Sequence, residues 1–228
     1  MTPYYEQDGI TIYHGDCMEF LGDYMDLRVV GRAFDLLLTD PPYGIGADRN
    51  TRANRQDGKA VAPSADYGVG DWDDKPAHEG VALARTICKH HIIFGGNYYH
   101  LPPCRCWLVW DKDNGSNDYA DCELAWTNFD KPVRKITYRW HGMLQQPGRE
   151  KEKRVHPTQK PEPVMVWALQ HAPADVRYVL DPFMGSGTTL VAAKRLGKSA
   201  TGIEREERYC ELAAQRLSQG ALPMEFSA

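Results

Sequence analysis

Two patterns of hydrophobic and polar positions alternate along the chain. Short β-rich runs predict strands, and longer stretches with helical periodicity predict helices. The predicted strands are Ile10–His14, Phe34–Thr39, His91–Gly95, Trp107–Trp110, Tyr178–Leu180 and Ser199–Ile203, with one or two more within 122–139. The predicted helices are Met18–Leu27, Ala77–His90, Glu162–His171, Thr188–Leu196 and Glu206–Leu217. This alternation predicts an α/β fold with a mainly parallel sheet.

Two polar segments, 44–71 and 142–154, follow neither pattern. Loops of this length in a compact domain are usually functional or disordered, so we expect mobile segments carried on a rigid sheet. The 228 residues fit one domain, and 42% hydrophobic residues suffice for a core and exclude a disordered chain.

The chain also lacks the marks of a membrane or secreted protein. No apolar run approaches the ~18 residues of a membrane helix, and the N-terminus has no signal-peptide pattern. The six cysteines contain no C-x-x-C pair, which argues against a zinc site or a disulfide framework. A cytoplasmic protein without a membrane partner is expected.

Charge is distributed unevenly. The net charge of −4 argues at first against a nucleic-acid partner, but the segment 131–160 holds nine Lys or Arg and two Glu, a local charge of +7. A basic strip on an acidic body is a footprint for phosphate contact. The alternative is a solvated, charged loop.

The stretch FDLLLTDPPYG, at 34–44, is the most informative. A buried strand is predicted to end at Asp40, and Pro41 and Pro42 follow at once. Prolines lack the N–H and disfavour a helical residue before them, so the segment presents acceptors, namely the Asp40 carboxylate and backbone carbonyls. A primary amine needs two acceptors, and Tyr43 adds a flat face for a planar base. The alternative is a strand that leaves the sheet through a proline-rich turn.

A second stretch, VLDPFMGSGTTLVAAKRLG at 179–197, predicts a strand, a glycine-bearing turn and a helix. Backbone N–H groups at such a helix start favour an anionic group. No Lys follows Gly187, as a P-loop requires, and the third glycine of a dinucleotide-binding motif is absent. Glu204 stands 23 positions after Asp181, close to the spacing of about 20 at which a carboxylate meets a ribose diol. The pair favours a nucleoside-containing cofactor.

Two further motifs are less specific. In HPTQKPEPV, at 156–164, prolines stiffen the entry to a helix while Thr158 and Lys160 stay free to bind an anion. The alternative is a helix-start linker. In ITIYHGDCMEFL, at 10–21, Asp16 ends a strand and Cys17 begins the next helix. For that motif alone, a simple N-cap aspartate is favoured over a functional role.

Together the four motifs resemble those of the N6-adenine/N4-cytosine DNA methyltransferase family in its β arrangement. In that arrangement D-P-P-Y, here at 40–43, precedes D-P-F-x-G-S-G-T, here at 181–188, with H-P-T-Q-K-P between them. The resemblance implies one Rossmann-like, S-adenosylmethionine-dependent domain over 1–228, with a mostly parallel, seven-stranded sheet and helices on both faces. The strands that end at Asp40 and Asp181 would be neighbours, with a target-recognition region at about 128–155 and the mobile loop at 44–71.

The resemblance also implies roles for individual residues. Asp40 and the Pro41 carbonyl would accept the two N–H groups of an exocyclic amine on a flipped-out base, and Tyr43 would stack on that base. The implied catalytic set is Asp40, Pro41, Pro42 and Tyr43. The implied S-adenosylmethionine set is Asp16 (at the adenine amino group), Glu204 (at the ribose), Cys17, Thr158, Lys160, Asp181, Phe183, Gly185, Ser186, Gly187 and Thr188. No metal is expected.

Double-stranded DNA is the implied substrate. Asp40 favours adenine N6, because N4-cytosine members of the family commonly carry Ser at that position, and cytosine N4 is the alternative. A catalytically idle Rossmann-like binding module is a remote alternative. A homodimer and, within restriction-modification, a cognate restriction endonuclease are partners that the family allows. The expected DNA contacts are Lys131, Arg134, Lys135, Arg139, Arg149, Lys151, Lys153, Arg154, Arg49, Arg52 and Arg55.

Overall fold

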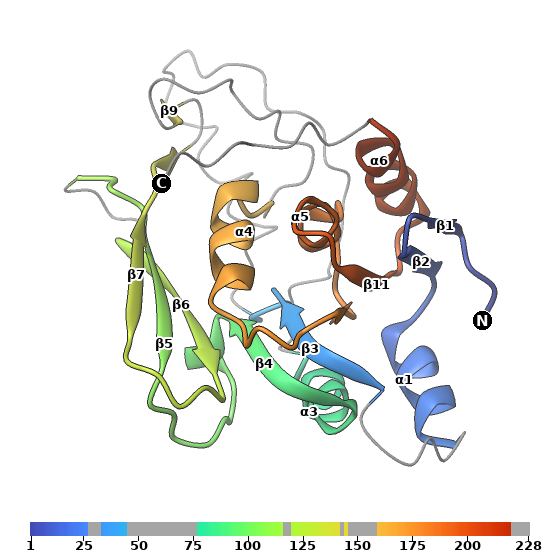
Figure 1. Ribbon diagram of the computed structural model, residues 1–228, viewed down its shortest axis with the longest axis horizontal. Coiled ribbons are helices and arrows are strands. Elements are labelled where there is room, and N and C mark those ends of the chain that lie inside the picture. The colour runs from blue at the N-terminus through green and yellow to red at the C-terminus, as the bar shows by residue number, and fades with distance from the viewer. Residues whose placement is uncertain (27–32, 45–76, 116–119, 142–143, 146–158, 220–228) are drawn as a thin grey trace.

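The computed structural model describes residues 1–26, 33–44, 77–115, 120–141, 144–145 and 159–219. Nine strands form one sheet in the order β1-β2-β11-β10-β3-β4-β6-β5-β7 (Figure 1). They are β1 (Tyr5–Gln7), β2 (Ile10–His14), β3 (Phe34–Thr39), β4 (Cys88–Phe94), β5 (Trp107–Asp111), β6 (Cys122–Thr127), β7 (Arg134–Thr137), β10 (Tyr178–Asp181) and β11 (Ser199–Glu204). The short pair β8 (Trp140–His141) and β9 (Leu144–Gln145) stands apart from this sheet.

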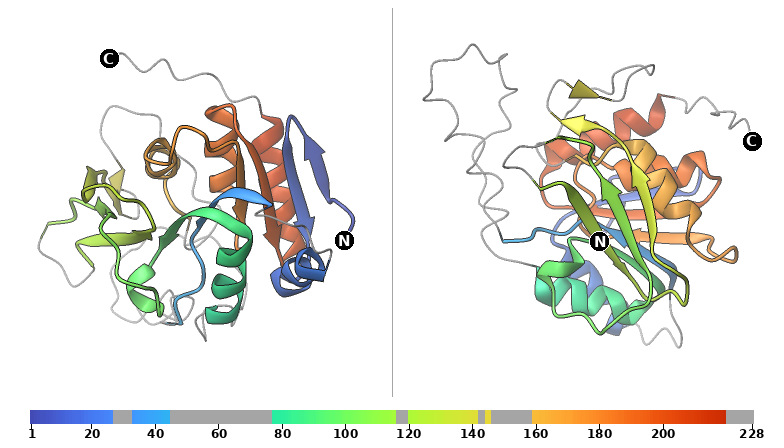
Figure 2. Two further views of the ribbon diagram at one scale, coloured as in Figure 1. Left: turned by 60° about the horizontal axis from the view of Figure 1, so that its bottom comes forward. Right: turned by 90° about the vertical axis from the view of Figure 1, so that its left-hand side faces the viewer.

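Five helices and one 3-10 turn complete the described chain: α1 (Cys17–Asp26), α3 (His78–Ile87), η1 (Gly96–Tyr98), α4 (Glu162–Gln170), α5 (Thr188–Arg195) and α6 (Glu207–Ser218). Figures 1 and 2 show α4, α5 and α6 on one face of the sheet and α1 and α3 on the other. Among the described helices, none is long and apolar enough to cross a membrane.

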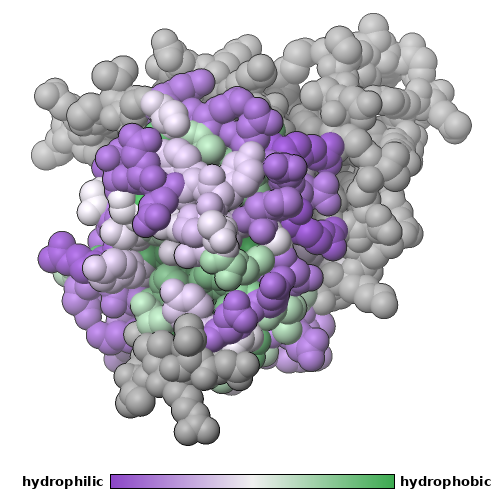
Figure 3. All heavy atoms as spheres, turned by 90° about the vertical axis from the view of Figure 1, so that its right-hand side faces the viewer, coloured by the Kyte–Doolittle hydropathy of each residue, from purple (hydrophilic) through white to green (hydrophobic). Residues whose placement is uncertain are grey.

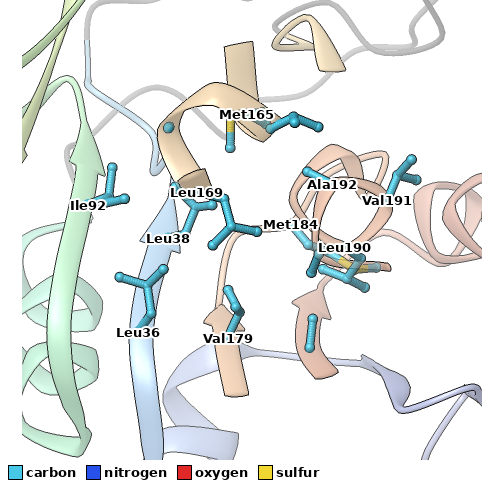
Figure 4. Close-up of a cluster of buried hydrophobic side chains, with 14 of the residues drawn as sticks. Leu36, Leu38, Ile92, Met165, Leu169, Val179, Met184, Leu190, Val191 and Ala192 are labelled. Atoms are coloured by element: carbon cyan, nitrogen blue, oxygen red, sulfur yellow. The ribbon is translucent and has the colours of Figure 1, made fainter. Parts of the chain in front are cut away.

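Side chains of the central strands alternate between the two helical layers. Leu36 and Leu38 on β3 pack with Met165 and Leu169 of α4 and with residues of α5, a cluster drawn in Figure 4. Leu37, between them, packs in the opposite layer with side chains of α1 and α3. All three leucines of β3 are fully buried, and each such burial stabilises the fold by about 1.5–3 kcal/mol. The continuous apolar run is therefore that of a central strand covered on both faces.

The Rossmann-like α/β fold is confirmed, although the sheet has nine strands rather than seven. Strands β1 and β7 add one strand at each edge, and both are short and largely exposed. Neither has the apolar alternation that reveals a strand in sequence. Asp8 and Gly9, with φ of +53° and +77°, form the tight turn that joins β1 to β2. Figure 3 looks onto this edge and shows a mostly hydrophilic surface around one apolar area.

Element boundaries shift where strand pairing overrides helical periodicity. The helix expected over Ala77–His90 ends at Ile87, and β4 begins at Cys88, three positions before the expected His91. The cause is pairing with β3, which places Phe34 opposite Cys88 and continues to Thr39. The one or two strands expected within 122–139 are β6 and β7. Of the segment 44–71, all but Gly44 lies outside the described residues, as does most of 142–154.

Candidate active site

The site lies where the order of the parallel strands reverses. Strands β10 and β3 are parallel neighbours, with Val179 opposite Leu36. From β10 the chain continues to β11 on one side, and β4 lies on the other side of β3. Open α/β sheets bind ligands at the carboxyl ends of strands at such a switch point. Asp181 is the last residue of β10 and Asp40 directly follows β3, so their predicted adjacency is confirmed.

A pocket of about 290 Å³ opens at this point. It is lined by nine of the eleven expected cofactor residues: Asp16, Cys17, Lys160, Asp181, Phe183, Gly185, Ser186, Thr188 and Glu204. Asp40 and Pro42 of the catalytic set line the same pocket, so both sets open into one space. Gly187 is the N-cap residue of α5 and does not line the pocket, and Thr158 lies outside the described residues. Gln159, Met165 and Tyr209 also line the pocket, and the sequence motifs did not single them out.

The glycine turn is held in shape from α6. Gly187 has a φ of +77°, and a side chain there would come within 2.7 Å of the Ala213 Cβ atom. Nη1 of Arg216 donates to the Ser186 carbonyl at 2.7 Å and lies 3.2 Å from Oγ1 of Thr188. Arg216 was missed because it is distant in sequence and belongs to no motif. Its contacts tie the turn between β10 and α5 to α6.

Two carboxylates on neighbouring strand ends accept backbone hydrogen bonds. Oε2 of Glu204 accepts from the Gly185 N–H at 3.1 Å, and Oε1 accepts from the Glu206 N–H at 2.7 Å. Burial raises the pKa of Glu204 above its ordinary value. Asp16 accepts from the Met18 N–H at 2.7 Å while also lining the pocket, so capping and pocket formation are compatible roles for it.

Asp181 is a buried carboxylate with neutral partners. Its Oδ1 accepts from Thr39 Oγ1 at 2.7 Å and from the Phe183 N–H at 3.1 Å. Burial raises the pKa of Asp181 to about 6, although hydrogen bonds from Thr189, Thr39 and Phe183 oppose the rise. No Lys, Arg or His in the described part of the chain forms an ion pair with it. A cationic group of a ligand would therefore find an uncompensated carboxylate here.

The expectation that Lys160 is free to bind an anion is wrong. Its ammonium lies 2.5 Å from Oδ2 of Asp40 and 2.9 Å from Oε2 of Glu123 on β6. Tyr43 Oη donates to the other oxygen of Asp40. Burial raises the pKa of the Asp40 carboxyl, and the Lys160 ammonium acts in the opposite direction. Glu123 was missed because its strand reaches the site only through the antiparallel pairing of β6 with β4.

The Pro41 and Pro42 carbonyls differ in their hydrogen bonds. The Pro42 carbonyl accepts from the Ala77 N–H at 3.3 Å and from Tyr99 Oη. Among the described residues, none donates to the Pro41 carbonyl. The Tyr43 ring lies against Gly95 and stacks on Tyr98, with centroids 5.0 Å apart and ring planes at 17°.

The expected basic strip does not form one surface in the described part of the chain. Lys131 precedes β7 and donates to the His171 carbonyl at 3.0 Å. It lies at the end of the strands opposite the pocket. Arg139 follows the carboxyl end of β7, the end of the strands at which the pocket lies, and pairs with Asp113. Lys135 pairs with Asp111 at 2.9 Å. Arg134 begins β7 and is exposed. The other expected contacts lie outside the described residues: Arg49, Arg52, Arg55, Arg149, Lys151, Lys153 and Arg154.

Comparison with known proteins adds independent information. The family model N6_N4_Mtase, described as DNA methylase, matches residues 106–215. Type II methyltransferase M2.LlaDCHI of Lactococcus lactis subsp. cremoris is 27% identical over 96% of this chain and 93% of its own. Type II methyltransferase M2.MboI of Moraxella bovis is 29% identical over 95% and 91%. Both alignments are nearly full-length and therefore extend far beyond the residues that the family model matches.

Two solved structures share the architecture. The M1.HpyAVI–SAM complex superposes with a TM-score of 0.57 at 25% identity, covering 91% of this chain and 98% of its own. The structure of PvuII DNA methyltransferase (cytosine-N4-specific) gives a TM-score of 0.58 over 99% and 90%, but at 14% identity it supports the fold alone. No group of three or more potential metal-ligating side chains gathers among the described residues.

Proposed function

The chain belongs to the N6-adenine/N4-cytosine DNA methyltransferase family, and on this premise we propose that it methylates the exocyclic N6 amine of a flipped-out adenine in DNA. The observation that carries the proposal is the single pocket shared by Asp40, an amine acceptor, and Asp181 with the glycine turn, a nucleoside-cofactor site. Donor and acceptor would meet at adjacent strand ends. Asp40, in place of the Ser common in N4-cytosine members, favours adenine, and cytosine N4 is the alternative.

S-adenosylmethionine is the methyl donor of this family, and the residues present fit it. Asp181, buried without a cationic partner among the described residues, suits an ammonium group. Glu204, on the wall beside the glycine turn, suits ribose hydroxyls, and Asp16 suits an adenine amino group. When bound, the donor supplies a sulfonium methyl, so that a C–N bond forms as the C–S bond breaks and one amine proton leaves to solvent.

The protein's own groups then act on the target amine. Asp40 accepts one N–H and the Pro41 carbonyl accepts the other, which turns the nitrogen lone pair away from conjugation with the ring and toward the methyl group. Tyr43 stacks on the extruded base and replaces part of the stacking energy lost on flipping, a few kcal/mol in total. The arrangement needs no covalent bond between enzyme and base.

Tritiated methyl transfer followed by nucleoside analysis tests the proposal. The protein is incubated with labelled S-adenosylmethionine and double-stranded DNA, and the DNA is digested and separated. Label in N6-methyladenine is the expected result. Label in N4-methylcytosine alone would overturn the choice of base, and no label with any DNA, together with no cofactor binding by calorimetry, would overturn the function. Sequencing of modified bases in cells expressing the protein would identify the recognition site.

Replacing Gly95 with Ala is expected to lower kcat about hundredfold, because a Cβ there would lie 2.1 Å from Cε1 of Tyr43 and displace its ring. Gly115→Ala is the matched control. Gly115 has a similar φ, +68° against +63°, but its Cβ would meet no described atom within 4 Å. Both variants carry the same left-handed backbone cost, about 1–2 kcal/mol, which thermal unfolding measures. Equal kcat values for the two variants would contradict a role for the Tyr43 position.

DNA binding is expected to depend on salt because Arg139, at the end of the strands where the pocket lies, contacts a DNA phosphate. Arg139→Gln should flatten the plot of log K against log salt by about 0.9, the value for one phosphate contact. Lys131→Gln, at the opposite end of the strands, should leave the slope unchanged. Fluorescence anisotropy at a series of salt concentrations measures both slopes. If Lys131→Gln flattens the slope and Arg139→Gln does not, the DNA lies at the end of the strands away from the pocket.

Association with other proteins belongs to the same proposal. The type II names of the relatives make a cognate restriction endonuclease a reasonable partner within a restriction-modification pair. Target recognition is assigned to the region of about 128–155. Sedimentation with and without DNA would decide between a monomer and a homodimer.

A further inference from the structure

Four buried or half-buried charges form a line that ends at the catalytic carboxylate. Lys112 Nζ lies 2.7 Å from Oε1 of Glu123, and the other oxygen of Glu123 lies 2.9 Å from Lys160 Nζ. Lys160 Nζ in turn lies 2.5 Å from Oδ2 of Asp40. The exposed fractions of the side chains are 21% for Lys112, 22% for Glu123, 7% for Lys160 and 19% for Asp40. The line joins a residue just after β5, one on β6, one just before α4 and one just after β3.

The alternation of charge explains why the line can be buried. Burying an ion is costly unless it is paired, and here each inner ion has an opposite charge on both sides. Burial opposes ionisation of Glu123, but the ammonium groups of Lys160 and Lys112 hold the pKa of its carboxyl at about 2. Glu123 is therefore ionised at neutral pH.

Glu123 and Asp40 compete for one ammonium. Lys160 carries three N–H donors, and these face Asp40, Glu123 and, at 3.3 Å, Tyr43 Oη. With Glu123 ionised, the ammonium is shared between two carboxylates. Without the charge on Glu123, the Lys160 ammonium would pair with Asp40 alone. A carboxylate in such an unshared ion pair is a weaker hydrogen-bond acceptor for a third group, here the target amine.

We propose that Glu123 is a positioning residue of the methyl transfer: Lys160 keeps the Asp40 carboxylate ionised, and Glu123, by sharing the Lys160 ammonium, leaves that carboxylate available to the target amine. The inference rests on the proposed role of Asp40. Lys112 belongs to the same arrangement because its ammonium pairs with the second carboxylate oxygen of Glu123. Among the described residues, Tyr43, Tyr99 and Asp181 are the other titratable groups near Asp40.

The sign of the effect follows from the charges that face Asp40. Burial raises the pKa of Asp40, Lys160 lowers it and the negative charge of Glu123 raises it again. Glu123→Gln removes that last contribution while it preserves shape. The acid limb of the kcat–pH profile, which reports ionisation of Asp40, is then expected to move down by about one pH unit. At neutral pH kcat is expected to fall about tenfold, with KM for S-adenosylmethionine little changed.

A double variant separates charge from shape. Lys160→Met alone leaves the carboxylates of Asp40 and Glu123 without a shared cation, so Asp40 takes up a proton. The acid limb of the kcat–pH profile then moves to higher pH, and kcat at neutral pH falls sharply. Adding Glu123→Gln to Lys160→Met removes the surplus negative charge and is expected to restore part of kcat. Glu162→Gln, which breaks the half-buried ion pair of Glu162 with Arg195, is the matched control and should leave the acid limb in place.

Titration of the Asp40 carboxyl by carbon-13 NMR, in the protein without DNA, measures the same effect without activity. A lower midpoint in Glu123→Gln, together with no change in Glu162→Gln, supports the inference. Unchanged midpoints, or a double variant no better than Lys160→Met, would overturn it. Failure of the intact protein to methylate DNA would overturn the proposed function instead, because the NMR midpoints do not depend on turnover.

Discussion

Asp40→Ala is expected to lower the rate of methyl transfer to DNA about 10²–10³-fold, because the variant loses the carboxylate that accepts an N–H of the target amine as charge develops on it. Cofactor affinity should change by less than about threefold, since the cofactor side of the pocket is built from β10, the glycine turn and β11. Lys160 keeps Glu123 as a partner in this variant, so no unpaired ammonium is left to unfold the site.

Single-turnover rates with labelled cofactor and calorimetric Kd values measure the two quantities. Asp175→Ala is a suitable control, because Asp175 forms an exposed ion pair with Lys89, at 2.7 Å, outside the pocket. This control should transfer methyl groups at the wild-type rate. A rate within tenfold of wild type for Asp40→Ala, or a comparable loss of cofactor affinity, would show that Asp40 does not hold the amine.

Asp181→Asn is expected to stabilise the protein without ligand and to abolish most cofactor binding. The folded-state pKa of Asp181, about 6, lies above the ordinary value of 3.8. The stability that its protonated form contributes is therefore fully present below about pH 4 and is lost as the pH rises through about 6. The difference between a pKa of 3.8 and one of about 6 corresponds to about 3 kcal/mol, the largest gain expected from Asp181→Asn at pH 8.

The same substitution should weaken S-adenosylmethionine binding about hundredfold, because it removes the charge opposite the ligand's ammonium group. Denaturant unfolding at pH 4 and pH 8, and calorimetry at pH 8, provide the measurements. At pH 4 the wild type and the variant should differ little in free energy of unfolding, which serves as an internal control. Equal stability at pH 8 together with unchanged cofactor affinity would mean that the carboxylate is neither strained nor used.

Local sequence alone determined the central strands, the helices and the place of the site. The apolar run before Asp40 and the short run before Asp181 can be buried on both sides only as central strands, and proline or glycine ends each of them. Their motifs identified the pocket, since nine of eleven expected cofactor residues line it. Sequence reasoning did not detect β1, although Asp8-Gly9 is a hairpin signal, because the three-residue strand YEQ carries no apolar alternation.

Only the tertiary structure decided what surrounds these motifs. Glu123 and Lys112 reach Asp40 because β6 inserts antiparallel between β4 and β5, a pairing that no local pattern encodes. The same pairing converts Lys160 from an expected anion ligand into a partner of two carboxylates. The basic strip, continuous in sequence, is divided because Lys131 lies before the amino end of β7 and Arg139 follows its carboxyl end, so the two lie at opposite ends of the strands. Charge acts through space, and the distances between charges are set by strand order rather than by position along the chain.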